Sequence, residues 1–232
     1  MQSDEGIKNV CQAEQILSLL RWQQLCQRFG INDRAAIERE FRCIVAAYAE
    51  SHRAYHTAQH IGECFTLLDW AAGQSSLTTQ QHLALEMALW YHDVVYRPQA
   101  YDNEWRSAQQ ATAFLRTYAA VSGQKLQVKA LIMATCHGDR WDRQIGLADW
   151  MMDIDLAILG ASPQRFWQYH HQIRQEYGWL PTRVYRTKRE EVLTGFLARS
   201  SIYRTDLFRA RFEAQARDNL LAVISASKFS SP

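Results

Sequence analysis

Apolar residues recur at intervals of three and four positions along nearly the whole chain, the spacing that places side chains on one face of an α-helix. The alternation typical of a half-buried strand is nearly absent, and no Asn-Gly or Asp-Gly turn joins two apolar runs. The pattern therefore predicts an all-α fold, a single compact bundle of roughly nine or ten helices.

Residues that favour helix ends divide this pattern into segments. Gly30 ends the first apolar stretch, and Asn32 or Asp33 can cap the helix that follows. Thr78 and Gln81 have the spacing of a capping box. The predicted helices cover approximately residues 10–29, 32–50, 57–72, 78–92, 103–121, 125–136, 149–160 and 163–178, with two more after Pro181 and Asp206.

The chain shows no boundary that would divide it into domains. It has 232 residues, four prolines and ten glycines, with no repeat, linker or low-complexity segment. A chain of this length buries about 70% of its unfolded surface on folding, so it can form a sizeable core without disulfides. We therefore expect one domain over residues 1–232.

Charge and cysteine content narrow the classes of partner and compartment. The net charge of +2 supplies no electrostatic argument for nucleic acid or for an anionic membrane as a partner. No apolar run reaches the roughly eighteen residues of a membrane span, and the N-terminus lacks the apolar core of a signal peptide. Five widely spaced cysteines favour free thiols in the cytoplasm over disulfides or a cysteine zinc site.

Two histidines, His56 and His60, stand four residues apart in the stretch "RAYHTAQHI". If the helix already includes His56, both lie on one helical face, where they could share a metal ion or divide metal binding and proton transfer. Taken alone, the pair could equally be hydrogen-bonded or solvated at the start of a helix.

A His-Asp pair follows in the stretch "LWYHDVVY". The apolar residues before His92 predict a buried helix, and a buried carboxylate such as Asp93 needs a compensating partner. A divalent metal would supply one, and the alternatives are a capping role or a salt bridge to Arg97. Because neighbouring helical residues point about 100° apart, both can bind one ion only where the helix ends or kinks.

Further candidate ligands lie later in the chain. Asp153 and Asp155 stand in the otherwise apolar stretch "DWMMDIDLAILG", where two carboxylates suggest a cation, although one of them could face solvent. His137 closes another apolar helix. Four histidines have less distinctive surroundings and are expected at or near the surface: His52, His82, His170 and His171.

No motif of a competing chemistry is present. The chain lacks the glycine-rich phosphate loops, the nucleophile elbow and the zinc-protease helix motif. Histidines and aspartates from separate helices instead predict a mixed nitrogen and oxygen site. Such a site suits one or two divalent metal ions, of Mn, Fe, Co, Ni or Zn, with Mg also allowed.

The ordered blocks "RAYHTAQHI", "YHDVVYRP", "YDNEWRSA", "TCH" and "DIDLAILG" resemble a subgroup of predicted phosphohydrolases in the HD superfamily, which is named for its His-Asp pair. With the later stretch "YHHQIRQEYGWL", the resemblance covers most of the chain. It implies an HD-type helical domain whose metal-site core lies at about residues 51–180. The terminal helices would pack on this core.

The resemblance also implies a set of metal ligands: His60, His92, Asp93 and Asp155. It favours Asp155 over Asp153 because the ligand in related enzymes often stands just before a leucine. The stretch "YHTAQHI" further resembles a block of cyclic-nucleotide phosphodiesterases, whose first histidine donates a proton to the leaving group. This likeness implies His56 as the proton donor.

The chain departs from the phosphodiesterases at Tyr96, where those enzymes carry a further histidine, so their substrate is not implied here. The HD resemblance implies hydrolysis of a small phosphorylated molecule, a nucleotide included, by a metal-activated water, with His56 and Asp93 as catalytic residues. Candidates for a second metal ion or for support of the first ligands are His137, Glu104 and Asp153. Candidates for binding phosphate are Arg53, Arg97, Arg174 and Arg183, although a surface ion pair is an equal alternative for each.

Two other classes of function stay open. Some HD-fold relatives hold two irons with similar ligands and act as oxygenases. The third possibility is a catalytically silent domain that binds a nucleotide or a metal for regulation. The oligomeric state is also open, with a homodimer among the options.

Overall fold

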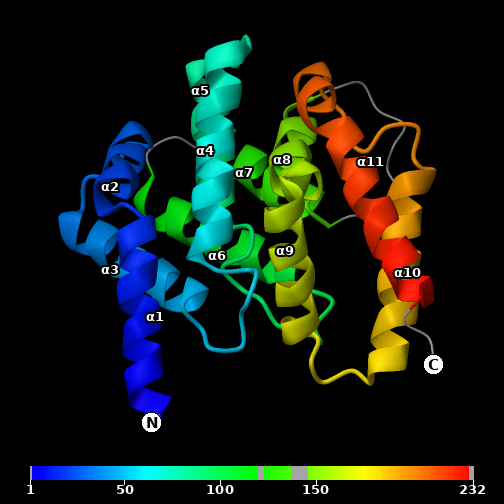
Figure 1. The fold of residues 1–232 in the computed structure, drawn as a ribbon. Helices are drawn as coiled ribbons and strands as arrows, with labels where there is room; N and C mark the ends of the chain where they lie inside the picture. The colour runs from blue at the N-terminus through cyan, green and yellow to red at the C-terminus, as the bar shows by residue number, and fades with distance from the viewer. Residues whose placement is uncertain (1, 120–122, 137–145, 230–232) are drawn as a thin grey trace. The chain divides into compact units, whose positions relative to one another are not determined.

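A computed structural model describes residues 2–119, 123–136 and 146–229 (Figure 1). These residues form eleven α-helices and one 3₁₀ helix, and no strand occurs among them. The prediction of an all-α domain is confirmed, with more helices than the roughly nine or ten expected.

The helices follow one another through short connections. Their bounds are α1 Gln2–Ile16, α2 Leu19–Arg28, α3 Arg34–Tyr48, α4 Ala58–Gln74, α5 Thr79–Tyr91, α6 Asn103–Tyr118, α7 Gly123–Ala134, α8 Leu147–Leu156, η1 (the 3₁₀ helix) Ala157–Gly160, α9 Pro163–Glu176, α10 Thr182–Ala198 and α11 Asp206–Phe229.

The chain falls into two compact units, Met1–Met151 and Met152–Pro232, with the division inside α8. The predicted metal-site core of about residues 51–180 runs across this division, and its limits stay a prediction. No helix of the described ranges is long and apolar enough to cross a membrane.

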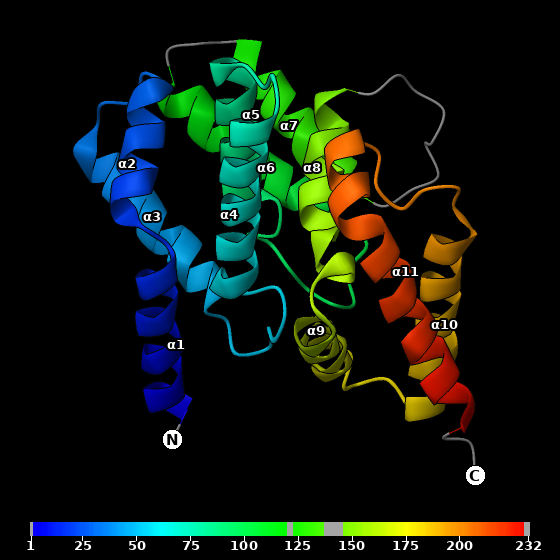
Figure 2. The ribbon, with the colours of Figure 1, turned by 45° about the horizontal axis from the view of Figure 1, so that its top comes forward.

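Helix α5 forms the core of the first unit. Every residue from Leu83 to Tyr91 is buried, as expected for a helix that is almost wholly apolar. Helices α2, α4, α6 and α7 each pack against it, and α4 and α5 lie side by side in Figures 1 and 2. In its last turn, the ring of Trp90 lies 5.2 Å from that of Trp22 and 4.9 Å from that of Phe65, centroid to centroid. This packing holds the turn from which His92 follows.

One charged residue is buried in α5. The carboxylate of Glu86 accepts a hydrogen bond from Nε of Arg21 at 2.5 Å, and the same guanidinium donates to both carboxylate oxygens of Asp69 at 2.7 and 2.8 Å. Since these residues belong to α2, α4 and α5, one arginine links three helices and balances the buried charge.

In the second unit, the 3₁₀ helix η1 lies against α11. The backbone at Gly160 approaches α11 so closely that a Cβ there would stand 2.6 Å from the carbonyl oxygen of Phe212. The side-chain amide of Asn219 donates to the carbonyls of Leu159 and Ala161 at 2.8 and 2.9 Å. Gly160 therefore ends the helix, as expected, and also permits this close approach.

The predicted helix 10–29 is two helices. α1 ends at Ile16, and Ser18 begins α2 by accepting a hydrogen bond from the amide of Arg21 at 3.2 Å. The apolar spacing continues across the break, so the periodic pattern did not reveal it. Two predicted helix starts are confirmed: Asp33 caps α3, and Thr78 and Gln81 form a capping box at α5.

Replacing Gly30 with alanine should lower the free energy of unfolding by about 1 kcal/mol, because Gly30 ends α2 with a φ of 73°, a conformation that a Cβ disfavours. Gly73→Ala is the control. Gly73 lies inside α4 with nothing within 4 Å of a Cβ, so alanine should raise the unfolding free energy by up to about 1 kcal/mol. Urea denaturation measures both changes, and equal shifts in the two variants would contradict this account of Gly30.

Candidate metal centre

Two histidines from different helices meet at the end of α5. His60 lies in the first turn of α4, and His92 is the C-cap residue of α5. Their Nε2 atoms are 3.2 Å apart, and both rings are buried. The Oδ2 atom of Asp93 lies 3.1 Å from Nε2 of His92 and 3.6 Å from Nε2 of His60. The helix ends just before the His-Asp pair, which is the condition under which both residues can face one ion.

The hydrogen bonds of the other ring nitrogens indicate where the protons lie. Nδ1 of His92 is 3.0 Å from the carbonyl oxygen of Leu89, which can only accept, so this nitrogen carries the hydrogen. Nδ1 of His60 is 3.0 Å from the hydroxyl of Tyr55. When the Tyr55 hydroxyl accepts a hydrogen bond from Nδ1 of His60, the Nε2 atoms of both histidines carry lone pairs. These lone pairs and the carboxylate of Asp93 then face one point. Metal-bound histidines are held in the same way, through the ring nitrogen that does not bind the ion.

A further carboxylate belongs to this group. Asp155, in the last turn of α8, is half-buried. One ligand atom each of His60, His92 and Asp155 lies within 4.8 Å of the others, so this His-His-Asp group could hold a metal ion. Imidazole nitrogen and carboxylate oxygen together suit a divalent transition metal, and a helical chain with this group is compatible with an HD-like fold.

Asp153 has a different environment from Asp155. Its side chain is fully buried and accepts hydrogen bonds from the amides of Arg204 and Thr205, at 2.8 and 2.7 Å, and from the Thr205 hydroxyl at 2.7 Å. The expectation that one of the two aspartates faces solvent is therefore wrong for Asp153. Its carboxylate holds the segment before α11 within the second unit, which accounts for a buried charge without a metal.

Arg53 braces the turn that leads to the histidines. Its buried side chain donates to Glu50, to the carbonyls of His56 and Asp93 at 3.1 and 2.7 Å, and to the carbonyl of Val94 at 3.0 Å. These bonds tie the turn before α4 to the turn after α5. They give Arg53 a structural role, and its role in binding phosphate stays a prediction.

His56 lies in a turn, outside α4, so it does not share a helical face with His60. The turn nevertheless brings the two rings to 6.2 Å, centroid to centroid. The ring of His56 stacks on Tyr96 at 4.0 Å. The stacking on Tyr96 therefore orients the ring of the predicted proton donor.

The remaining predicted residues have varied surroundings. Glu104 is half-buried in α6 beside the thiol of Cys136, whose pKa rises to about 11 through burial and through the Glu104 charge. Arg97 is exposed, and the side chain of Asn103 bonds its backbone N–H and C=O at 3.1 and 2.9 Å. His137 lies outside the described residues. Arg174 and Arg183 belong to α9 and α10 of the second unit.

The sequence interpretation missed one neighbour of the histidine pair. The sulfur of Cys64 lies 3.7 Å from Nδ1 of His60 and is buried. Its spacing of four residues after His60 places it one helical turn further along α4, so the helical repeat could have revealed it. Cys64 and Tyr55 both contact the ring of His60 and limit its rotation.

Comparison of the chain with known protein families, with curated proteins and with solved structures found no match. The likeness to HD phosphohydrolases therefore rests on the sequence blocks and on the histidine–carboxylate group itself.

Replacing Asp153 with asparagine should lower the free energy of unfolding by about 2–3 kcal/mol, because the amide group cannot accept all three hydrogen bonds and its NH₂ faces backbone N–H donors. Asp155→Asn is the matched variant. It makes the same chemical change two residues away. In the metal-free protein it should lower the free energy of unfolding by less than half as much as the Asp153 variant. Urea denaturation in the presence of a chelator measures both. A larger loss for the Asp155 variant would reverse the roles assigned to the two carboxylates.

Proposed function

We propose that this protein is a metal-dependent phosphohydrolase that cleaves an ester or anhydride bond of a small phosphorylated molecule. The observation that carries the proposal is the convergence of two histidine nitrogens and a carboxylate at one buried point, with Asp155 in the same group. Acceptors brought this close repel one another unless a cation lies between them. The order of the sequence blocks, from "RAYHTAQHI" to "DIDLAILG", supports the HD type.

In this proposal His60, His92, Asp93 and Asp155 would hold one or two divalent ions. Their ligand atoms suit Mn, Fe, Co, Ni or Zn, with Mg also allowed. A bound divalent metal lowers the pKa of a coordinated water and supplies hydroxide near neutral pH. Leu89 and Tyr55 would keep the two imidazoles in the orientation needed for binding, because each bonds the ring nitrogen that does not face the ion.

His56 would act as the general acid. It lies outside the histidine pair, and its stacking on Tyr96 holds the ring in one plane. A proton donor at this place could protonate the departing oxygen as the bond to phosphorus breaks. Arg53 would contribute by position, since its hydrogen bonds to the carbonyls of His56 and Asp93 set the distance between the acid and the ligand pair.

Elemental analysis of the purified protein should find at least one transition-metal ion per chain, and His92→Ala should lose it, because removing one ligand of a small set lowers affinity strongly. His82→Ala is the control and should keep the ion. His82 lies on the same helix α5, and its ring faces Asp69 and Glu86 at 3.7 and 3.8 Å. A wild-type protein that stays empty after incubation with each ion would contradict the metal site and favour a proton shared between the histidines.

In the metal-loaded protein, His56→Gln should keep the ion but lower kcat by about 10²–10⁴ on an alkyl phosphate that the wild type cleaves. The loss should be much smaller on a p-nitrophenyl ester, because p-nitrophenolate leaves without a proton. Equal losses of kcat on both esters would contradict the role of His56 as general acid.

A metal-loaded wild type that cleaves no phosphoester or phosphoanhydride would contradict the proposed function. Two irons per chain with a mixed-valent spectrum would favour the oxygenase.

A further inference from the structure

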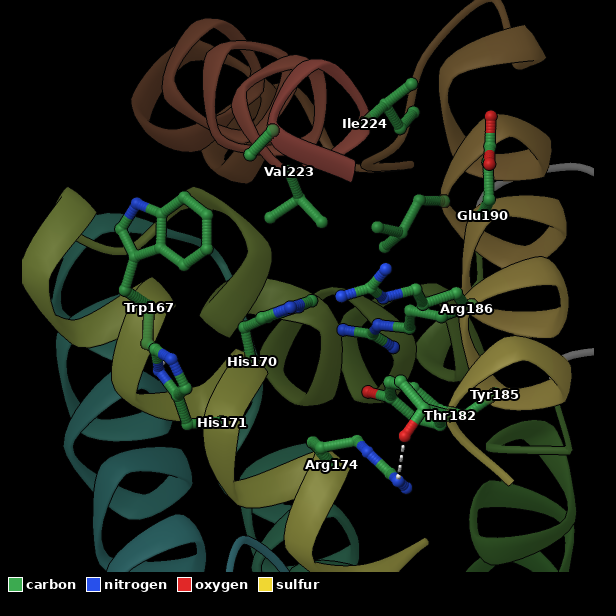
Figure 3. Close-up of a pocket in the computed structure, with 13 residues that line it drawn as sticks. Trp167, His170, His171, Arg174, Thr182, Tyr185, Arg186, Glu190, Val223 and Ile224 are labelled. Atoms are coloured by element: carbon green, nitrogen blue, oxygen red, sulfur yellow. Dashed lines mark hydrogen bonds between the residues drawn. The ribbon is translucent and has the colours of Figure 1, made fainter. Parts of the chain in front are cut away.

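A cavity of about 360 Å³ lies entirely within the second unit, between α9, α10 and α11 (Figure 3). A cavity of this size falls in the range of small-molecule sites. Residues from α9 and α10 supply its polar side, and Val223 and Ile224 of α11 contribute apolar side chains. None of these residues belongs to the histidine–carboxylate group described above.

Several buried polar atoms of this cavity have no hydrogen-bond partner among the described residues. They are Nδ1 of His170, the hydroxyl of Tyr185, and Nε and Nη2 of Arg189. Tyr185 is only 6% exposed, and Figure 3 shows its hydroxyl on the side of the cavity that faces His170. A buried polar group without a hydrogen-bond partner is unfavourable, and three side chains with such groups around one cavity indicate that a ligand supplies the partners.

The charge of the lining favours an anion. Arg174, Arg186 and Arg189 line the cavity, and Glu190 is the one carboxylate among its described lining residues. In Figure 3 the side chain of Glu190 points away from His170. Because arginine stays protonated in proteins, the lining residues carry a net positive charge. His170 adds no charge near neutral pH, since burial, together with Arg189 and His171, lowers its pKa to about 4.

The arginines are held in fixed positions by their surroundings. Arg174 donates to the carbonyls of Tyr177 and Leu180 at 2.7 and 3.2 Å, and its guanidinium lies 4.7 Å from the ring centroid of Tyr185. Arg189 lies over the ring of Tyr169 at 5.0 Å. Arg174 therefore positions Tyr185, while Arg189 bonds Tyr169 and keeps its Nε and Nη2 without a partner among the described residues beside the cavity. A guanidinium held in this way loses little freedom when it binds an oxyanion.

We propose that this cavity binds a small organic anion, a phosphate ester or a carboxylate. Its oxyanion would accept hydrogen bonds from Arg189, Tyr185 and His170. Its apolar body would lie against the apolar lining residues Trp167, Leu193 and Val223. A purely structural core would not need the Tyr185 hydroxyl, because phenylalanine fills the same space without a buried donor. The inference does not depend on the proposed metal chemistry.

The test measures binding of phenyl phosphate, benzoate and benzyl alcohol to the full chain by calorimetry in the presence of a chelator. Phenyl phosphate, benzoate or both should bind, and benzyl alcohol should not, because it lacks the oxyanion. Binding of phenyl phosphate alone would assign the cavity to phosphate esters, and binding of benzoate alone or of both would extend it to carboxylates. A lack of binding by both anions, or equal binding of the alcohol, would overturn the proposal.

Two variants locate the site. Arg189→Gln should weaken binding by about tenfold or more, because a charge-assisted hydrogen bond is lost. Tyr185→Phe should weaken binding by about three- to tenfold while leaving the melting temperature of the ligand-free protein unchanged or higher. Lys188→Gln is the control. It removes one positive charge on α10, at an exposed residue outside the cavity lining, and should leave binding unchanged.

The outcomes of these measurements distinguish an anion site in the cavity from binding at the metal centre and from general charge attraction. Equal weakening by the Lys188 and Arg189 variants would mean general charge attraction without a specific site. A fall in the melting temperature of ligand-free Tyr185→Phe would mean a structural role for the hydroxyl. Binding that is lost in His92→Ala would move the anion to the histidine group. Each of these outcomes would overturn the inference, whereas failure of metal loading alone would leave it intact.

Discussion

One buried guanidinium joins the two turns on which the histidine pair depends. The side chain of Arg53 has no exposed surface, and a buried cation is tolerated only where its donors are met. Arg53 donates hydrogen bonds to Glu50 and to three backbone carbonyls. These carbonyls belong to the turn before α4 and to the turn after α5. His60 and His92 stand at the adjoining ends of those helices. The 3.2 Å approach of their Nε2 atoms is therefore held by the same contact between turns.

The two aspartates of α8 show how surroundings decide what a carboxylate does. Residues two apart on a helix point about 200° apart, so the two side chains leave α8 in nearly opposite directions. Asp153 finds backbone N–H donors and a hydroxyl, which satisfy its charge within the second unit. Asp155 instead belongs to the group of His60 and His92. One carboxylate stabilises the fold, and its neighbour is available for chemistry.

The two candidate sites hold polar groups in arrangements that a purely structural core would avoid. In the first, nitrogen and oxygen acceptors converge, which favours a cation. In the second, the hydroxyl of Tyr185 and Nε and Nη2 of Arg189 are buried donors without acceptors among the described residues, which favours an anion. Proteins retain such locally unfavourable arrangements mainly where a ligand or a reaction needs them. The opposite charges favoured by the two candidate sites are consistent with different ligands.

The sequence by itself determined the features that act over a few residues. The Thr78–Gln81 capping box, the Asp33 cap and the turn at Gly30 are local hydrogen bonds and backbone preferences, and the structure has all three. His60 was conspicuous for its spacing of four residues from His56, and His92 because it follows an apolar stretch that predicts a buried helix, where a polar side chain needs a partner. Only the tertiary structure decided that Asp153 meets the segment before α11, and that Tyr185 and Arg189 face His170 around a cavity. Periodicity shows which face of a helix is apolar. It does not show which distant side chain lies opposite, because packing between helices decides that contact.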